Sequence, residues 1–143
     1  MTEAEQMAAW NNLIVNAYPI VYEKGDERRA AAIASTYMGI AHNGGLNHFL
    51  TFSWDLDARE VLAALETLGA DVAADQLRQV LEQIDDPLPA STQDERWDRL
   101  DDVWTGELNA LDALTVEADR DLVAALERHV ASHAEHYLNM TAD

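Results

Sequence analysis

The fold class is decided by residues 30–45, which read AAAIASTYMGIAHNGG. Apolar side chains recur at intervals of three and four residues: Ala30, Ile33, Ala34, Tyr37, Ile40 and Ala41. This spacing places them along one face of an α-helix, and their small size lets a neighbouring helix approach closely. Asn43-Gly44-Gly45 then predicts the end of the helix, because glycine adopts positive φ angles at little steric cost.

The same periodicity extends through the rest of the chain, and no segment reads as a strand. Thr2 and Glu5 have capping-box spacing ahead of a helix that reaches Pro19 and continues to Tyr22 as a kinked turn. Further helices are predicted over 26–42, from a cap at Asp55 or Asp57 to 68, and over 71–84, 92–114 and 122–138. A short apolar segment is predicted at 46–52, a proline-containing loop at 85–91 and a turn region at 115–119. The sequence predicts an all-α fold, a single compact domain over 1–143 with about six to seven helices.

The net charge of the chain indicates which kinds of partner it can bind. The 143 residues contain 27 Asp and Glu against 9 Lys and Arg, for a net charge of −18. Such a charge disfavours direct binding to nucleic acid or to an anionic membrane, and it favours a basic protein. With 48% hydrophobic residues, the chain is too apolar to be a disordered acidic tail.

The sequence lacks the residues that several kinds of reaction and site require. The chain has no cysteine, which excludes disulfides and thiol nucleophiles. Phosphate-binding, dinucleotide-binding and nucleophile-elbow motifs are missing, so we predict a non-enzyme without a cofactor. An acidic amino terminus and the lack of a long apolar run predict a cytoplasmic protein.

The negative charge is concentrated between residues 82 and 121, where 13 carboxylates and three arginines give a net charge of −10. On the predicted helix over 92–114, five aspartates fall on one arc beside the apolar stripe of Trp97, Leu100 and Trp104: Asp94, Asp98, Asp101, Asp102 and Asp112. The functional interpretation is a surface that imitates the DNA phosphate backbone and binds a basic partner. An ordinary solvated face explains the same pattern, and so does adaptation to high salt, since Lys24 is the only lysine beside eight arginines.

Three histidines follow one face of the predicted last helix, with His129, His133 and His136 at i, i+4 and i+7. They are weak candidates for a metal site, because the catalytic His-Glu-x-x-His spacing is missing. Partly buried structural histidines are the alternative. The four tryptophans are predicted to be core or dimer-interface anchors: Trp10, Trp54, Trp97 and Trp104.

The run from His42 to Leu50 (HNGGLNHFL), followed by ALETLGA at 64–70 and LNALD at 108–112, resembles a small all-helical bacterial domain of unknown function whose best-known member is a DNA mimic. The resemblance covers about residues 37–138. It differs at Leu46, where an aromatic is usual, and at His48, where glutamine is usual. It implies a helical fold, dimerisation and binding to a transcription factor, while Asn43, Gly44 and Gly45 are interpreted first as a structural turn.

The leading hypothesis is a non-enzymatic acidic protein that occupies the DNA-binding surface of a basic partner. A homodimer of this chain is possible. The alternative is a helical interaction or immunity-type module that binds through apolar contacts, its acidity serving only solubility or salt adaptation.

Overall fold

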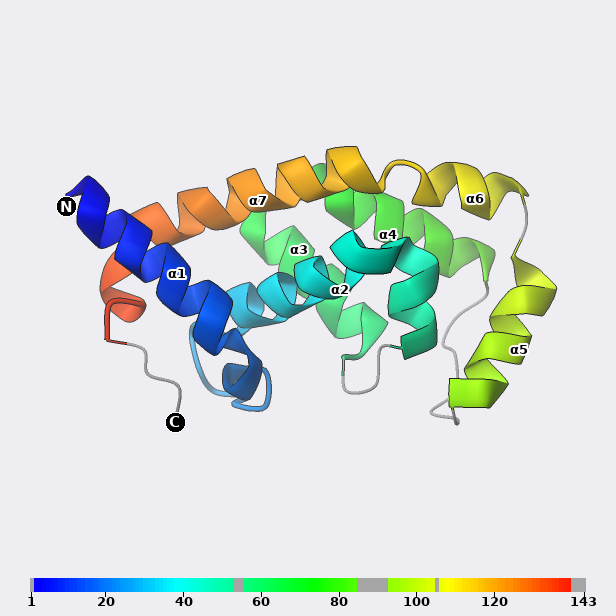
Figure 1. The fold of residues 1–143 in the computed structure, drawn as a ribbon, viewed down its shortest axis with the longest axis horizontal. Helices are drawn as coiled ribbons and strands as arrows, with labels where there is room; N and C mark the ends of the chain where they lie inside the picture. The colour runs from blue at the N-terminus through cyan, green and yellow to red at the C-terminus, as the bar shows by residue number, and fades with distance from the viewer. Residues whose placement is uncertain (1, 53–55, 85–92, 105, 140–143) are drawn as a thin grey trace.

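The computed structural model describes residues 2–52, 56–84, 93–104 and 106–139 (Figure 1). Over these ranges the chain forms only helices, which confirms the all-α prediction: α1 (Glu3–Ile20), α2 (Arg29–Phe52), α3 (Ala58–Leu68), α4 (Asp71–Gln83), α5 (Gln93–Val103), α6 (Gly106–Asp112), α7 (Thr115–Ser132) and the short 3₁₀ helix η1 (Ala134–His136). The predicted loop over 85–91, the cap residue Thr92 and Trp54 lie outside the described residues.

Helix α1 begins and ends where the sequence predicts. The Thr2 hydroxyl oxygen accepts a hydrogen bond from the backbone N–H of Glu5 at 3.1 Å. Pro19 lies in the last turn, and after Ile20 the chain leaves the helix through a turn. Asp26 then accepts hydrogen bonds from the backbone and guanidinium of Arg28, and this pairing lowers the pKa of Asp26. The helix predicted from Asp26 therefore starts at Arg29, after that turn.

Helix α2 is the central element and packs against α1, α3, α5, α6 and α7. The predicted end at Gly45 is only half right, because the backbone leaves helical geometry there, with φ 77° and ψ −171°, and then resumes a helix to Phe52. The apolar segment predicted over 46–52 is thus the second half of α2. Across the kink, the rings of Tyr37 and Phe49 pack edge to face with centroids 4.7 Å apart.

Helices α3 and α4 form a pair with well-defined ends. Asp57 caps α3 by accepting from the backbone N–H of Arg59 at 2.8 Å, and Gly69 ends the helix in the left-handed conformation, at φ 75°. The end at Gly69 was predicted, and of the two predicted caps, Asp55 and Asp57, the structure has Asp57. The amino end of α4 has no cap of its own, and Asp121 of α7 supplies one from across the structure, at 2.9 Å from the backbone nitrogen of Val72.

Two predicted helices have different bounds in the structure. The single helix predicted over 92–114 is wrong, because α5 ends at Val103 and α6 starts at Gly106. The helix predicted over 122–138 starts earlier, at Thr115, where a turn was predicted, and it ends at Ser132 before η1. Glycine stabilises a helix interior poorly, so Gly106 marks the first of these breaks.

The buried apolar side chains of all seven helices meet in one core, which includes Leu13, Phe49, Leu65, Leu77 and Leu126. Helices α1 and α5 lie at opposite ends of the long axis of the molecule (Figure 1). Within the described residues, no helix is both long and apolar enough to span a membrane.

Candidate functional site

Helix α5 carries four of the five aspartates predicted to bind a partner. Asp94, Asp98, Asp101 and Asp102 are all exposed. Their spacing of four, three and one residues places them on one side of the helix. On another side Leu100 is 1% exposed, and α5 packs against α2. The helix is thus attached through Leu100, with its aspartates directed to solvent.

The tryptophans of this region differ from the predicted buried stripe. Trp104 is partly buried against the core, and its indole N–H donates to the side-chain oxygen of Asn109 at 2.6 Å. Trp97 is 55% exposed, which excludes the core alternative for this residue and leaves the dimer-interface alternative a prediction. It lies about two turns before Trp104, near the middle of α5.

Asp112 does not share the α5 surface, because it ends α6, after the break in the predicted helix. Its Oδ1 accepts a hydrogen bond of 2.7 Å from the backbone N–H of Leu46, the first residue after the kink in α2. A break inside a helix leaves N–H groups without their usual carbonyl partners, and a carboxylate satisfies them with favourable charge. Asp112 thus acts as an amino-terminal cap, supplied from 66 residues away, for the second half of α2.

The turn residues Asn43, Gly44 and Gly45 have structural contacts that match their predicted role. The Asn43 side chain donates to the carbonyl of Gly39 at 2.9 Å. A β-carbon at Gly45 would lie 2.6 Å from Asp112 Oδ1, and one at Gly44 would lie 2.5 Å from the β-carbon of His48. Both positions therefore require glycine, because neighbouring atoms lie too close for a β-carbon. Gly45 is also required by its positive φ angle.

Other carboxylates of the acidic segment also serve the fold, which sequence reasoning missed. Asp121 caps α4, as described above. Asp119 Oδ2 lies 2.9 Å from Nδ1 of His42 on α2. Between α6 and α7, the Thr115 hydroxyl donates to the backbone carbonyl of Asp112 at 2.6 Å. Gln76 of α4 donates to the Thr115 hydroxyl at 3.2 Å and so links α4 to the turn between these two helices. The acidity of residues 82–121 therefore combines structural caps near α6 and α7 with an exposed set on α5.

The three carboxy-terminal histidines lie next to one another, and two of their rings are stacked. His129 and His133 stack with centroids 4.6 Å apart, and His133 and His136 are 5.6 Å apart. His129 Nε2 lies 2.5 Å from the hydroxyl of Tyr137, a buried side chain whose pKa is raised to about 12 by burial. Burial, followed by repulsion from the other two imidazoles, lowers the pKa of His129.

His136 also lies 3.5 Å from Glu27 and 3.6 Å from Glu135. In the described part of the chain, no group of three His, Asp or Glu side chains is arranged to hold a metal ion. The contacts of these histidines join the end of α7 to η1.

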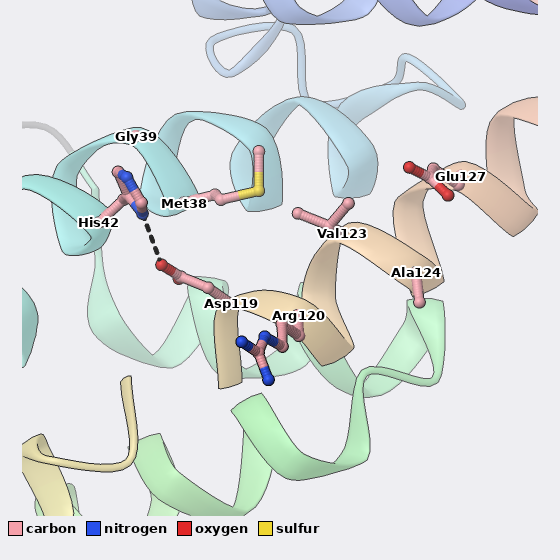
Figure 2. A pocket seen from close by; sticks show the side chains of 8 residues that line it. All are labelled: Met38, Gly39, His42, Asp119, Arg120, Val123, Ala124 and Glu127. Carbon is pink, nitrogen blue, oxygen red and sulfur yellow. Dashed lines mark hydrogen bonds and ion pairs between the residues drawn. The ribbon is translucent and has the colours of Figure 1, made fainter. Parts of the chain in front are cut away.

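A groove of about 550 Å³ lies between α2 and α7, and Figure 2 shows its lining. Met38 and Val123 lie next to each other in it, with Ala124 further along α7. The pair of His42 and Asp119 closes one end. Arg120 and Glu127 complete the lining, so an apolar floor has charged groups of both signs around it.

The sequence was compared with protein families, curated proteins and solved structures. The sequence model of one family, described as DMP19-like protein, matches residues 25–133. No curated protein and no solved structure gives a significant match. The matched range includes the kink in α2 and all of α5 and α7, and it leaves α1 outside. Because the match covers more than half of the sequence, the chain belongs to the DMP19-like (DNA mimic protein 19-like) family.

Proposed function

We propose that this chain is a non-enzymatic mimic of the DNA backbone, which occupies the DNA-binding surface of a basic protein such as a transcription factor. It acts through charge and shape and needs no cofactor. The observation that carries the proposal is the set of exposed aspartates on α5, defined here as the α5 acidic face: Asp94, Asp98, Asp101 and Asp102. Membership of the DMP19-like family supports it.

The charge spacing of this face resembles that of one DNA strand. From Asp94 to Asp102 a helix rises about 12 Å at 1.5 Å per residue, which gives one carboxylate per about 4 Å. A strand of B-DNA has one phosphate per about 3.4 Å of helix axis. The average density of negative charge along the two helix axes is therefore similar.

Exposed Trp97 strengthens the proposed surface. It lies beside the aspartates on α5 and is 55% exposed. Tryptophan is enriched among the residues that dominate binding energy at protein interfaces. We therefore assign to Trp97 an apolar contact with the partner, next to the charged contacts of the α5 acidic face.

Asp112 was predicted to belong to the same surface, and we now propose a structural role for it instead. Its Oδ1 is already bonded to the backbone N–H of Leu46. Moving that carboxylate toward a partner would leave a backbone donor of α2 without its cap.

The test is competition for DNA. Each transcription factor encoded next to this gene is bound to its fluorescently labelled operator, and the purified chain is titrated in at low and moderate salt. We expect release of DNA that weakens as salt rises, because the attraction is between opposite charges. Asp98→Asn/Asp101→Asn/Asp102→Asn should raise the concentration needed for release at least about tenfold, which corresponds to about 1.4 kcal/mol of binding energy.

A second triple variant separates the α5 acidic face from net charge alone. Glu3→Gln/Glu23→Gln/Glu127→Gln removes the same number of charges at exposed positions on or beside α1 and α7. It should release DNA nearly as well as the unmodified chain. Equal loss in both triple variants would mean that only overall charge matters, and no release by the unmodified chain from any regulator would refute the proposal.

The groove between α2 and α7 favours a second candidate function, that of a helical interaction module which binds through apolar contacts. Its floor of Met38, Val123 and Ala124 offers a place for an apolar side chain of a partner. Val123→Asp would then abolish binding, while the triple neutralisation of α5 would leave it unchanged. The same two variants give the opposite outcomes if the chain is a DNA mimic.

A further inference from the structure

The groove between α2 and α7 has an apolar floor and a carboxylate near each end. Its volume of about 550 Å³ is typical of sites that hold small molecules. Met38 and Val123 meet on the floor, while Asp119 and Glu127 lie toward opposite ends (Figure 2). Gly39 leaves the floor open, since a β-carbon added there would have no atom within 4 Å. The groove thus offers space for a slender molecule lying lengthwise.

The two carboxylates are set apart by a distance that the helix determines. Asp119, Val123 and Glu127 follow one another at intervals of four residues, along one row of α7. Eight residues at 1.5 Å per residue separate the first from the last by about 12 Å along the helix axis. The row is therefore negative at both ends and apolar in the middle.

Both carboxylates have oxygens available to a ligand. Glu127 is exposed, and within the described residues it forms no hydrogen bond or ion pair. Asp119 Oδ2 lies 2.9 Å from Nδ1 of His42, which leaves Oδ1 for a second donor, because a carboxylate accepts through both oxygens. Arg120 also belongs to the lining, but Figure 2 shows its guanidinium pointing away from Met38 and Val123. No positive charge therefore lies over the apolar floor in the described structure.

We propose that this groove binds a linear aliphatic diamine, an unbroken chain of methylenes with an ammonium group at each end. The methylenes bury apolar surface against Met38 and Val123, and the ammonium groups donate to Asp119 and Glu127. An extended chain advances roughly 1.2 Å per bond, so about eight methylenes are needed to reach both carboxylates. Octamethylenediamine has this length. The net charge of −18 favours such a dication over an anion of the same length.

This site is independent of the proposed DNA mimicry, because its described lining comes from α2 and α7 and the α5 acidic face contributes nothing to it. It also differs from the second candidate function, in which an apolar side chain of a partner covers the same floor and needs neither carboxylate. A diamine needs both carboxylates. Substitutions at the two ends of the groove therefore distinguish the two occupants.

The test is nuclear magnetic resonance of the full chain with isotope-labelled methionine methyl groups, at about 150 mM salt to screen binding elsewhere on the acidic surface. The chain has four methionines, and Met38→Leu and Met7→Leu identify the two signals of interest. We expect octamethylenediamine to shift the Met38 signal saturably, with a dissociation constant of about 1 mM or below. The signal of Met7, exposed on α1, should stay unchanged.

Substitutions at the two ends test the role of the carboxylates. Glu127→Gln and Asp119→Asn should each weaken binding at least about threefold, as expected for an ion pair near the surface. The matched control is Glu117→Gln, which removes an exposed carboxylate from the same helix outside the groove and should leave binding unchanged. Equal weakening in Glu117→Gln and Glu127→Gln would overturn the proposal, because overall charge would then explain the binding.

A series of ligands tests the apolar floor. Spermidine has the same chain length as octamethylenediamine, but a charged nitrogen replaces one of the central methylenes. It should bind several-fold more weakly, because that charge would lie over Met38 and Val123. Tighter binding of spermidine would overturn the proposal, and so would the lack of a Met38 shift at about 10 mM octamethylenediamine. Octanol binding as tightly as the diamine would also overturn it, in favour of an apolar side chain as the occupant.

Discussion

Replacing Gly45 with alanine tests whether the kink in α2 and its carboxylate cap are one structural unit. The residue lies at φ 77° and ψ −171°, a region that only glycine occupies readily, and a side chain there costs about 1–3 kcal/mol of backbone strain. The added methyl carbon would also lie 2.6 Å from Asp112 Oδ1 and force that carboxylate away from Leu46. Losing a hydrogen bond to a charged group costs about 1.5–3 kcal/mol. We expect Gly45→Ala to lower the free energy of unfolding by about 3–5 kcal/mol, a large part of the 5–15 kcal/mol typical of a domain.

The assay is equilibrium unfolding in urea followed by circular dichroism, with two other glycines as controls. Gly69→Ala places alanine in a left-handed cap with no atom within 4 Å of the new β-carbon, and should cost only about 1–2 kcal/mol. Gly39→Ala, inside the first half of α2 with equally open space, should stabilise by about 0.5–1 kcal/mol. The reasoning is refuted if Gly45→Ala costs no more than Gly69→Ala, because the clash with Asp112 would then contribute nothing.

Three other predictions follow from contacts described above. Asp112→Ala should destabilise by about 1.5–3 kcal/mol in urea unfolding, since the Leu46 N–H loses its acceptor; a change below about 0.5 kcal/mol would contradict the cap. The pKa of His129 is lower in the fold than the ordinary value of 6.5, so the unfolded chain binds a proton at this residue more readily; the stability that neutral His129 contributes is full above pH 6.5 and is lost as pH falls through the lowered pKa. The free energy of unfolding, measured between about pH 5 and 8, should therefore depend less steeply on pH in His129→Gln than in the unmodified chain. An unchanged pH dependence would contradict the lowered pKa. Leu126→Ala, at a fully buried position, should cost about 2–5 kcal/mol by thermal unfolding, and Leu114→Ala, at a position 41% exposed, should cost far less.

Features governed by neighbouring residues could be predicted from the sequence. The cap at Thr2, the left-handed end at Gly69 and the departure from the helix after Pro19 each depend on residues within one or two turns. The apolar periodicity of 30–41 likewise identified α2, because burial on one side of a helix leaves a pattern of three and four. The exposure of the aspartates on α5 follows from the same periodicity.

Features governed by distant residues could not be predicted. Asp112 reads as one more member of an acidic helix, and only the fold brings it to the kink 66 residues away. For the same reason Asp121 could not be recognised as the cap of α4. Gly106 was a usable signal for the break between α5 and α6, but the continuing stripe of Trp104, Leu108 and Leu111 favoured one long helix. The end of α7 at Ser132 has no glycine or proline to mark it.

The position of α1 and α5 at opposite ends of the molecule has a consequence for experimental design (Figure 1). A fluorescent label or a surface tether attached through α1 lies far from the α5 acidic face and leaves that face open to a partner. Substitutions on the two helices are also far apart, and the effects of distant substitutions on stability usually add. Each end of the molecule can therefore be altered and tested without disturbing the other.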